Sequence, residues 1–181
     1  RVCDVAELST ANLPGTPALA WASFPCQDLS LAGNRGGLAA ERSGTFWPFW
    51  RLMQGLATEG RQPRLIVLEN VYGAITSHEG KGFRAIAEAF TQAGYYFGAL
   101  VVDAIHFLPQ SRPRLFIVGT SSATEIPRHT TQAGPNPLWH PPAICERVEE
   151  LSEKAKRRWI WWRLPEPSAR ETIFSDLLED E

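Results

Sequence analysis

Two short apolar segments constrain the fold more than any other feature of the sequence. Residues 18–24 (ALAWASF) lie between two prolines, and residues 64–71 (RLIVLENV) follow a third. Apolar runs of this length, bounded by proline, are typical of buried strands in a parallel sheet. Residues 43–60 lie between them, with Ser and Thr near the start and Gly at the end, which predicts a helix. The three segments together predict a β-α-β unit.

The same alternation continues along the chain. Residues 80–93 place apolar side chains at helical spacing before a glycine, and they predict a second helix. Residues 95–105 and 114–120 are apolar and predict two further strands, joined by a loop that contains PQSRPR. Alternating strands and helices favour an α/β domain, in which ligands bind at the carboxyl ends of the parallel strands. Cys26 and Glu69 fall at such ends.

The last third of the chain has a different composition. Residues 121–142 are rich in Thr, Pro, Gly and Asn, which predicts a linker or a long loop. Residues 143–165 carry mixed charges and predict one helix. Its tryptophans, Trp159, Trp161 and Trp162, are expected to pack against the core rather than to stack on bases.

Composition limits the classes of protein to which the chain can belong. With 181 residues, 44% hydrophobic and 21% charged, it has the make-up of one soluble globular domain. No apolar run approaches the roughly 20 residues that span a bilayer, so we expect a cytoplasmic protein without a membrane partner. The net charge of −2 gives no general sign of nucleic-acid binding.

Cysteine and histidine spacing argues against a metal site. The three cysteines, Cys3, Cys26 and Cys145, are odd in number and widely separated, and the four histidines form no H-x-x-x-H pair. We therefore expect reduced thiols and no bound metal.

Three groups of residues remain as candidates for chemistry. Cys26 stands between a proline and Gln27 and opens a glycine-rich loop, so it is either a nucleophile or a small apolar residue. Glu69 ends an apolar strand, where a raised pKa would let it donate a proton, or where it could be structural. Arg112 and Arg114 lie on the same side of an extended chain and could act on a substrate or simply pair with Glu69.

Taken in order, FPCQ-x-x-S-x-A-G, ERSGTFW, ENV and Q-S-R-P-R resemble the core motifs of the DNA (cytosine-5)-methyltransferases. The resemblance implies a Rossmann-like fold that uses S-adenosylmethionine, here incomplete at both ends. A glycine-rich motif is expected before Asp4, and a target-recognition domain is expected after Glu181. Residues 1–130 would then be a partial catalytic domain, and residues 131–181 a linker and helix leading towards that recognition domain.

The resemblance also implies a role for individual residues. The catalytic residues would be the thiol of Cys26, the acid Glu69, and the arginines Arg112 and Arg114. The cofactor would contact Asp4, Val5, Pro25 and Phe46, whereas Gln27, Ser30 and Asn70 would contact the substrate.

The implied reaction is methyl transfer from S-adenosylmethionine to C5 of cytosine in double-stranded DNA. A thiolate would add to C6, and the base would be turned out of the duplex to reach it. The resemblance further suggests a restriction endonuclease as a genetic partner. A transfer-RNA cytosine-5 methyltransferase and a non-catalytic remnant with the same fold are the alternatives, although the presence of the thiol, the acid and both arginines argues against a remnant.

Overall fold

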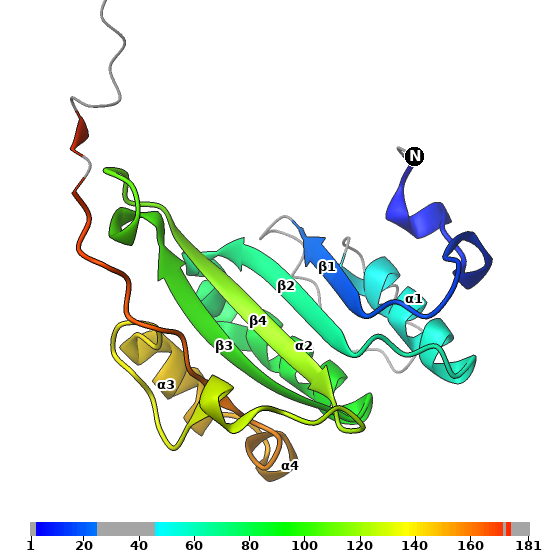
Figure 1. Cartoon of the computed structure of the whole chain (residues 1–181). Helices are drawn as coiled ribbons and strands as arrows, with labels where there is room; N and C mark the ends of the chain where they lie inside the picture. The colour runs from blue at the N-terminus through cyan, green and yellow to red at the C-terminus, as the bar shows by residue number, and fades with distance from the viewer. Residues whose placement is uncertain (1–2, 25–45, 172, 175–181) are drawn as a thin grey trace, which may run out of the picture.

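A mixed four-stranded sheet is the centre of the structure. The computed structural model describes residues 3–24, 46–171 and 173–174, and it places helices on one face of this sheet (Figure 1). The strands β1 (Leu19–Ser23), β2 (Leu65–Val71), β3 (Tyr95–Asp103) and β4 (Pro113–Ser121) lie in the order β1-β2-β4-β3. β1 and β2 are parallel, and β4 is antiparallel to both of its neighbours. β1, β2 and β3 therefore end at one side of the sheet, which we call the carboxyl edge.

The helical face holds the main core, which α1 (Phe46–Thr58) and α2 (Lys81–Gln92) cover. α2 confirms the predicted second helix, and α1 lies within the range predicted for the first. The ring of Phe90 in α2 stacks on Phe97 of β3 at 5.6 Å and meets Trp50 of α1 edge-on at 5.0 Å. The parallel pairing of β1 with β2, with α1 between them in the chain, confirms the predicted β-α-β unit. Short 3₁₀ helices occupy Val5–Glu7, Thr10–Asn12, Tyr72–Ile75, Ser77–Gly80, Ala104–His106 and Arg128–Thr130.

The predicted single helix over residues 143–165 is wrong. Three elements replace it: α3 (Pro142–Glu149), α4 (Glu153–Lys156) and the short strand β6 (Trp161–Trp162). Ser152 interrupts the helix because its hydroxyl accepts a hydrogen bond from the backbone NH of Ala155 and caps α4. β6 then pairs with β5 (Thr131–Gln132). Tertiary pairing has overridden the local helical preference of a charged segment.

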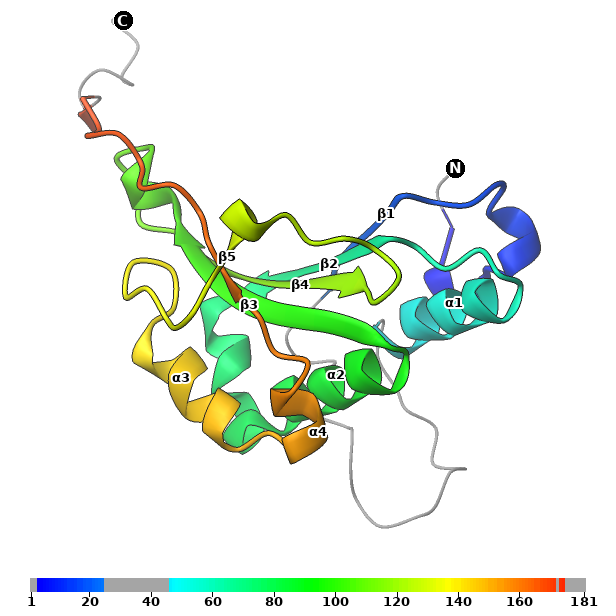
Figure 2. The same cartoon turned by 60° about the horizontal axis from the view of Figure 1, so that its bottom comes forward.

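The tryptophans of this segment pack into the protein, as the sequence predicts. The ring of Trp159 lies 5.5 Å from Phe97 and 6.1 Å from Phe83. The indole NH of Trp162 donates to the backbone carbonyl of Val118 at 3.1 Å. Residues 139–162 therefore cover the part of the sheet formed by β3 and β4 (Figure 2).

The connection over residues 121–142 is long but anchored. Trp139 and His140 are each only 2% exposed, and the carbonyl of Trp139 accepts a hydrogen bond from the NH of Val101 at 2.8 Å. Burial of the imidazole holds the pKa of His140 below its usual value, so the ring stays neutral at physiological pH. Across the described part of the chain, no helix is long and apolar enough to cross a membrane.

β1 departs from the expected burial. Leu19 is 50% exposed and Trp21 is 53% exposed, whereas Ala20 and Ala22 face the helical core. Among the described residues β1 pairs only with β2, so it forms an edge of the sheet, and its larger side chains lie on the face that α1 and α2 leave open. The prediction of a buried strand is therefore wrong for β1, although it holds for the centre of β2.

A close approach at Gly98 of β3 lets the segment before β6 dock. The backbone NH of Phe97 donates to the carbonyl of Arg158, and the NH of Ile160 donates to the carbonyl of Phe97. A Cβ atom at position 98 would overlap the carbonyl oxygen of Ile160. We therefore expect Gly98→Ala to lower the free energy of unfolding by roughly 1–3 kcal/mol, measured by chemical denaturation.

Gly73→Ala is the matched control, because a Cβ at position 73 would meet no atom within 4 Å. It should change the stability by less than about 0.5 kcal/mol. Equal stability of the two variants would contradict the docking of residues 158–160 on β3.

Candidate active site at the carboxyl edge

An ion pair joins two neighbouring strands near the carboxyl edge. Glu69 lies near the end of β2 and Arg114 near the start of β4, where Arg114 is the cross-strand partner of Val71. Nε of Arg114 lies 3.2 Å from Oε1 of Glu69, and both side chains are 22% exposed. The two residues are therefore partly shielded but accessible from the surface, as an acid that acts on a bound molecule must be.

Asn70 lies next to Glu69 but points to the opposite face of the sheet. Its side chain is buried, and Nδ2 donates to the backbone carbonyl of Phe24 at 2.9 Å. Its Oδ1 accepts a hydrogen bond from the NH of Val71 at 2.8 Å. The amide thus links the end of β2 to Phe24, which follows β1 and precedes Cys26 by two residues.

Asp103 organises the connection between β3 and β4. Its carboxylate accepts hydrogen bonds from the backbone NH groups of Ile105 at 3.1 Å and Arg112 at 2.6 Å, and from the hydroxyl of Ser111 at 3.0 Å. Desolvation alone would raise the pKa of Asp103, but these three hydrogen bonds and the nearby His106 outweigh it and hold that pKa below its usual value. The carboxylate stays charged and keeps the turn closed.

The two arginines of the PQSRPR loop differ in their surroundings. Arg112 precedes β4 and is exposed, whereas Arg114 lies within β4 and is partly buried. Among the described contacts Glu69 pairs with Arg114. The structure therefore brings Glu69 and Arg114 together, turns Asn70 to the opposite face of the sheet, and leaves Arg112 exposed.

The residues expected to contact the cofactor are found in two different settings. Asp4 is exposed, and its Oδ1 caps the first 3₁₀ helix by accepting a hydrogen bond from Ala6 at 2.8 Å. Val5 is partly buried against the core. Phe46 is fully buried, with its ring 5.5 Å from Phe24.

Four predicted site residues, Pro25, Cys26, Gln27 and Ser30, lie outside the described residues. Within the part that the structure describes, no group of three or more His, Cys, Asp and Glu side chains could hold a metal ion.

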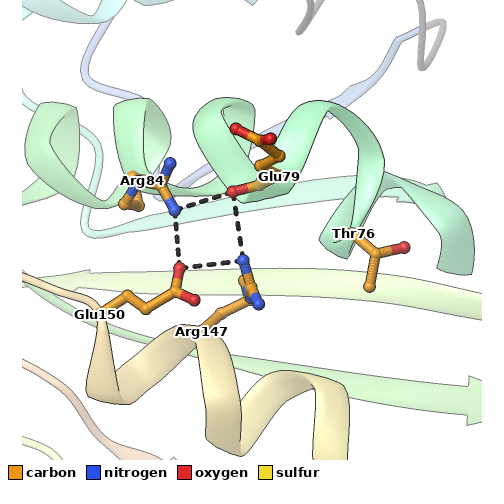
Figure 3. Close-up of a pocket in the computed structure, with 5 residues that line it drawn as sticks. All are labelled: Thr76, Glu79, Arg84, Arg147 and Glu150. Carbon is orange, nitrogen blue, oxygen red and sulfur yellow. Dashed lines mark hydrogen bonds and ion pairs between the residues drawn. The ribbon is translucent and has the colours of Figure 1, made fainter.

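A second polar cluster was not anticipated from the sequence. Arg84 and Arg147 each donate to the carboxylate of Glu150, at 2.6 and 2.9 Å, and to the backbone carbonyl of Glu79, at 2.9 and 3.1 Å (Figure 3). The open pocket beside them measures about 490 Å³. Glu79 and its neighbour His78 have φ values of 56° and 51°. Because Glu150 already meets both guanidinium groups, we interpret the cluster as a clamp that ties α3 to the turn before α2.

Comparison with known proteins identifies a related family. A family model described as C-5 cytosine-specific DNA methylase matches residues 2–175. The Type II methyltransferase M.BsuFI of Bacillus subtilis is 36% identical over 117 residues, which are 64% of this chain and 27% of that protein. The Type II methyltransferase M.HaeII of Haemophilus aegyptius is 32% identical over 117 residues, 64% of this chain and 35% of that protein. The chain thus spans about a quarter to a third of the length of these curated relatives.

Solved structures support the expected fold. The S. pombe Dnmt2 methyltransferase superposes with a TM-score of 0.52 at 21% identity, covering 70% of this chain and 38% of that one. The methyltransferase EhMeth of Entamoeba histolytica gives a TM-score of 0.50 at 19% identity, covering 74% and 42%. The prediction of a Rossmann-like methyltransferase fold is confirmed.

Proposed function

Because the chain belongs to the C-5 cytosine-specific DNA methylase family, we propose that the complete protein transfers a methyl group from S-adenosylmethionine to C5 of cytosine in double-stranded DNA. The observation that carries the proposal is the pairing of Glu69 with Arg114, on strands that meet at the carboxyl edge. Ligands of open α/β sheets bind outside this edge. Asn70 ties the same place to the chain segment that leads to Cys26.

The chemistry requires these residue types because C5 of cytosine is a poor nucleophile. The thiolate of Cys26 forms a bond to C6, and the electron pair of the C5–C6 double bond moves through the ring to C5 and N3. Glu69 donates a hydrogen bond or a proton at N3 and so stabilises this charge. After C5 has taken the methyl group, a base removes the C5 proton, the double bond forms again and the thiolate leaves.

Arg114 keeps the carboxyl group of Glu69 oriented in this scheme. Its guanidinium lies 3.2 Å from Oε1 and also donates to the carbonyl of Pro113 at 2.9 Å, which fixes its own position. Arg112, which is exposed, would contact the target nucleotide from the surface. Gln27 and Ser30 would contact the DNA.

The residues near the start of the chain suit an adenosine. The exposed carboxylate of Asp4 can accept hydrogen bonds from a ligand, and Val5 beside it offers apolar surface. Pro25 would supply a further apolar contact, whereas Phe46 is fully buried beside Phe24 and offers no surface of its own. S-adenosylmethionine supplies the methyl group when it is bound.

Asn70 is assigned a positioning role instead of the expected contact with the substrate. Its amide is buried and occupied on both sides by Phe24 and Val71, so we propose that it holds the chain before Cys26 against β2. Asn70→Asp keeps the shape, but a carboxylate cannot donate to the carbonyl of Phe24. We expect kcat to fall roughly 10-fold, because a buried carbonyl loses its donor and the thiol is displaced.

The measurement that tests this role compares kcat with the KM for DNA and for S-adenosylmethionine. A positioning role lowers kcat and leaves both KM values within about twofold, since the substrate contacts remain. An unchanged kcat together with a lower melting temperature would show that Asn70 serves stability alone.

The function itself is tested in cells that express the complete reading frame. Bisulfite sequencing of their DNA and of their transfer RNA should show new 5-methylcytosine in DNA, at one sequence context. Methylation in transfer RNA alone would favour the alternative substrate. No new methylation in either nucleic acid, from a folded and expressed protein, would favour a non-catalytic module.

A further inference from the structure

The connection between β3 and β4 exposes three large apolar side chains. Ile105 is 43% exposed, Phe107 is 53% exposed and Leu108 is 49% exposed. The connection projects beyond the end of the sheet at the carboxyl edge in both views (Figures 1 and 2). We call residues 105–108 the apolar tip. Single exposed apolar residues are common on protein surfaces, but a cluster of them marks a binding surface.

The apolar tip is held in a closed turn. The NH groups of Phe107 and Leu108 donate to the carbonyl of Ala104 at 2.8 and 2.7 Å. The carboxylate of Asp103 links the two ends of the connection, because it accepts hydrogen bonds from the NH of Ile105 and from the NH of Arg112. A side chain presented on a fixed turn loses little conformational entropy when it binds. The tip is therefore preorganised for a contact.

His106 anchors the tip at its base. Its ring meets Trp139 edge-on at 5.8 Å, on the side of the connection that packs against the protein. The neighbouring residues 105, 107 and 108 remain exposed. The ring of Phe107 meets that of His106 edge-on at 6.4 Å and still stays 53% exposed, while the turn itself is attached to the protein.

An exposed arginine lies beside the apolar tip. The carboxylate of Asp103 accepts hydrogen bonds from backbone NH groups and from the hydroxyl of Ser111, and not from the guanidinium of Arg112. Among the ion pairs of the described residues, Glu69 meets Arg114 and none involves the exposed side chain of Arg112. An exposed guanidinium beside an apolar surface suits a partner with phosphates outside and stacked bases inside.

We propose that the apolar tip binds the DNA and that Phe107 packs against the bases next to the target cytosine. The proposal rests on the proposed function, because it assigns a contact to the same DNA. Turning a base out of the duplex breaks its stacking, and apolar wedges of other DNA-binding proteins offset such losses by inserting between base steps. Arg112 contacts the adjacent phosphate.

The test compares two DNA duplexes in the complete methyltransferase. Both contain the sequence context found by bisulfite sequencing. In one of them the target cytosine faces an abasic site, so that this base has no pairing partner and leaves the duplex more easily. Phe107→Ser should slow single-turnover methylation of the normal duplex roughly 10-fold, the size expected when one aromatic contact to a base is lost. On the abasic duplex the loss should shrink to about twofold, because less stacking remains to be replaced.

Two further variants control for folding. Phe107→Trp keeps an aromatic ring and should retain activity on both duplexes. Tyr96→Ser removes an exposed aromatic ring, 37% exposed, from the opposite end of β3, and should leave both rates unchanged.

The outcomes separate the two proposals. An equal loss on both duplexes with Phe107→Ser, or a loss accompanied by a lower melting temperature, would show that the tip contacts another part of the protein and would overturn the DNA contact. Unchanged rates would also overturn it. A wild-type protein that methylates neither duplex would instead overturn the proposed function.

Discussion

The variant Cys26→Ala of the complete protein is expected to transfer no measurable methyl group to DNA. In the proposed reaction the thiolate of Cys26 forms the bond to C6, and without that bond C5 stays too weak a nucleophile to react. The effect should be the largest of any single substitution in this chain. It is measured as tritium transferred from labelled S-adenosylmethionine to DNA.

DNA that contains 5-fluorocytosine gives a second readout for the same residue. The wild-type protein should form an adduct that survives denaturation, because fluorine at C5 cannot leave as a proton does. Cys3→Ala and Cys145→Ala are matched controls, since Cys3 is exposed at the start of the chain and Cys145 lies in α3. Both should keep the adduct. An adduct formed by Cys26→Ala would assign the nucleophile to another residue.

Replacement of Glu69 by Gln is expected to lower the rate of methyl transfer by about 10²-fold, the usual contribution of a general acid. The substitution discriminates between two roles. If Glu69 only orients Arg114, the amide oxygen of Gln can still accept from Nε and activity should survive. If Glu69 acts on N3 of the cytosine, the acidic proton is lost.

Stability measurements complete that experiment. The ion pair with Arg114 is partly exposed, so its loss should change the free energy of unfolding by at most about 1 kcal/mol. Glu59→Gln is the control, because Glu59 also pairs with an arginine, Arg61 at 3.1 Å, on the chain after α1. It should leave methyl transfer unchanged. Full activity of Glu69→Gln would remove the catalytic role.

Much of the fold could be predicted because the relevant signals are local. In β2 and in α2 the buried side chains all belong to one element. The spacing of apolar residues along that element is therefore enough to predict it. The edge position of β1 could not be found this way, because it depends on which strands lie beside it. The break near Ser152 depends on β6 finding β5, and no local pattern contains that pairing.

The candidate site was predictable to a similar degree. Order along the chain placed Glu69 and Arg114 near the same edge, and their pairing was one of two interpretations open from the sequence. The position of Asn70 was missed, although a signal existed. Ile66, Leu68 and Asn70 alternate along β2, so all three face the core, and a buried amide there must have hydrogen-bond partners.

The open side of β1 has a consequence for the behaviour of these 181 residues in solution. Within the described part of the chain, one edge of this strand has no neighbouring strand. Exposed apolar surface from Leu19, Trp21 and Leu65 lies beside that edge. Unpaired strand flanks next to apolar surface recruit other chains, which leads to oligomers and precipitates. This strand edge will therefore limit the solubility of the isolated polypeptide, which will be low.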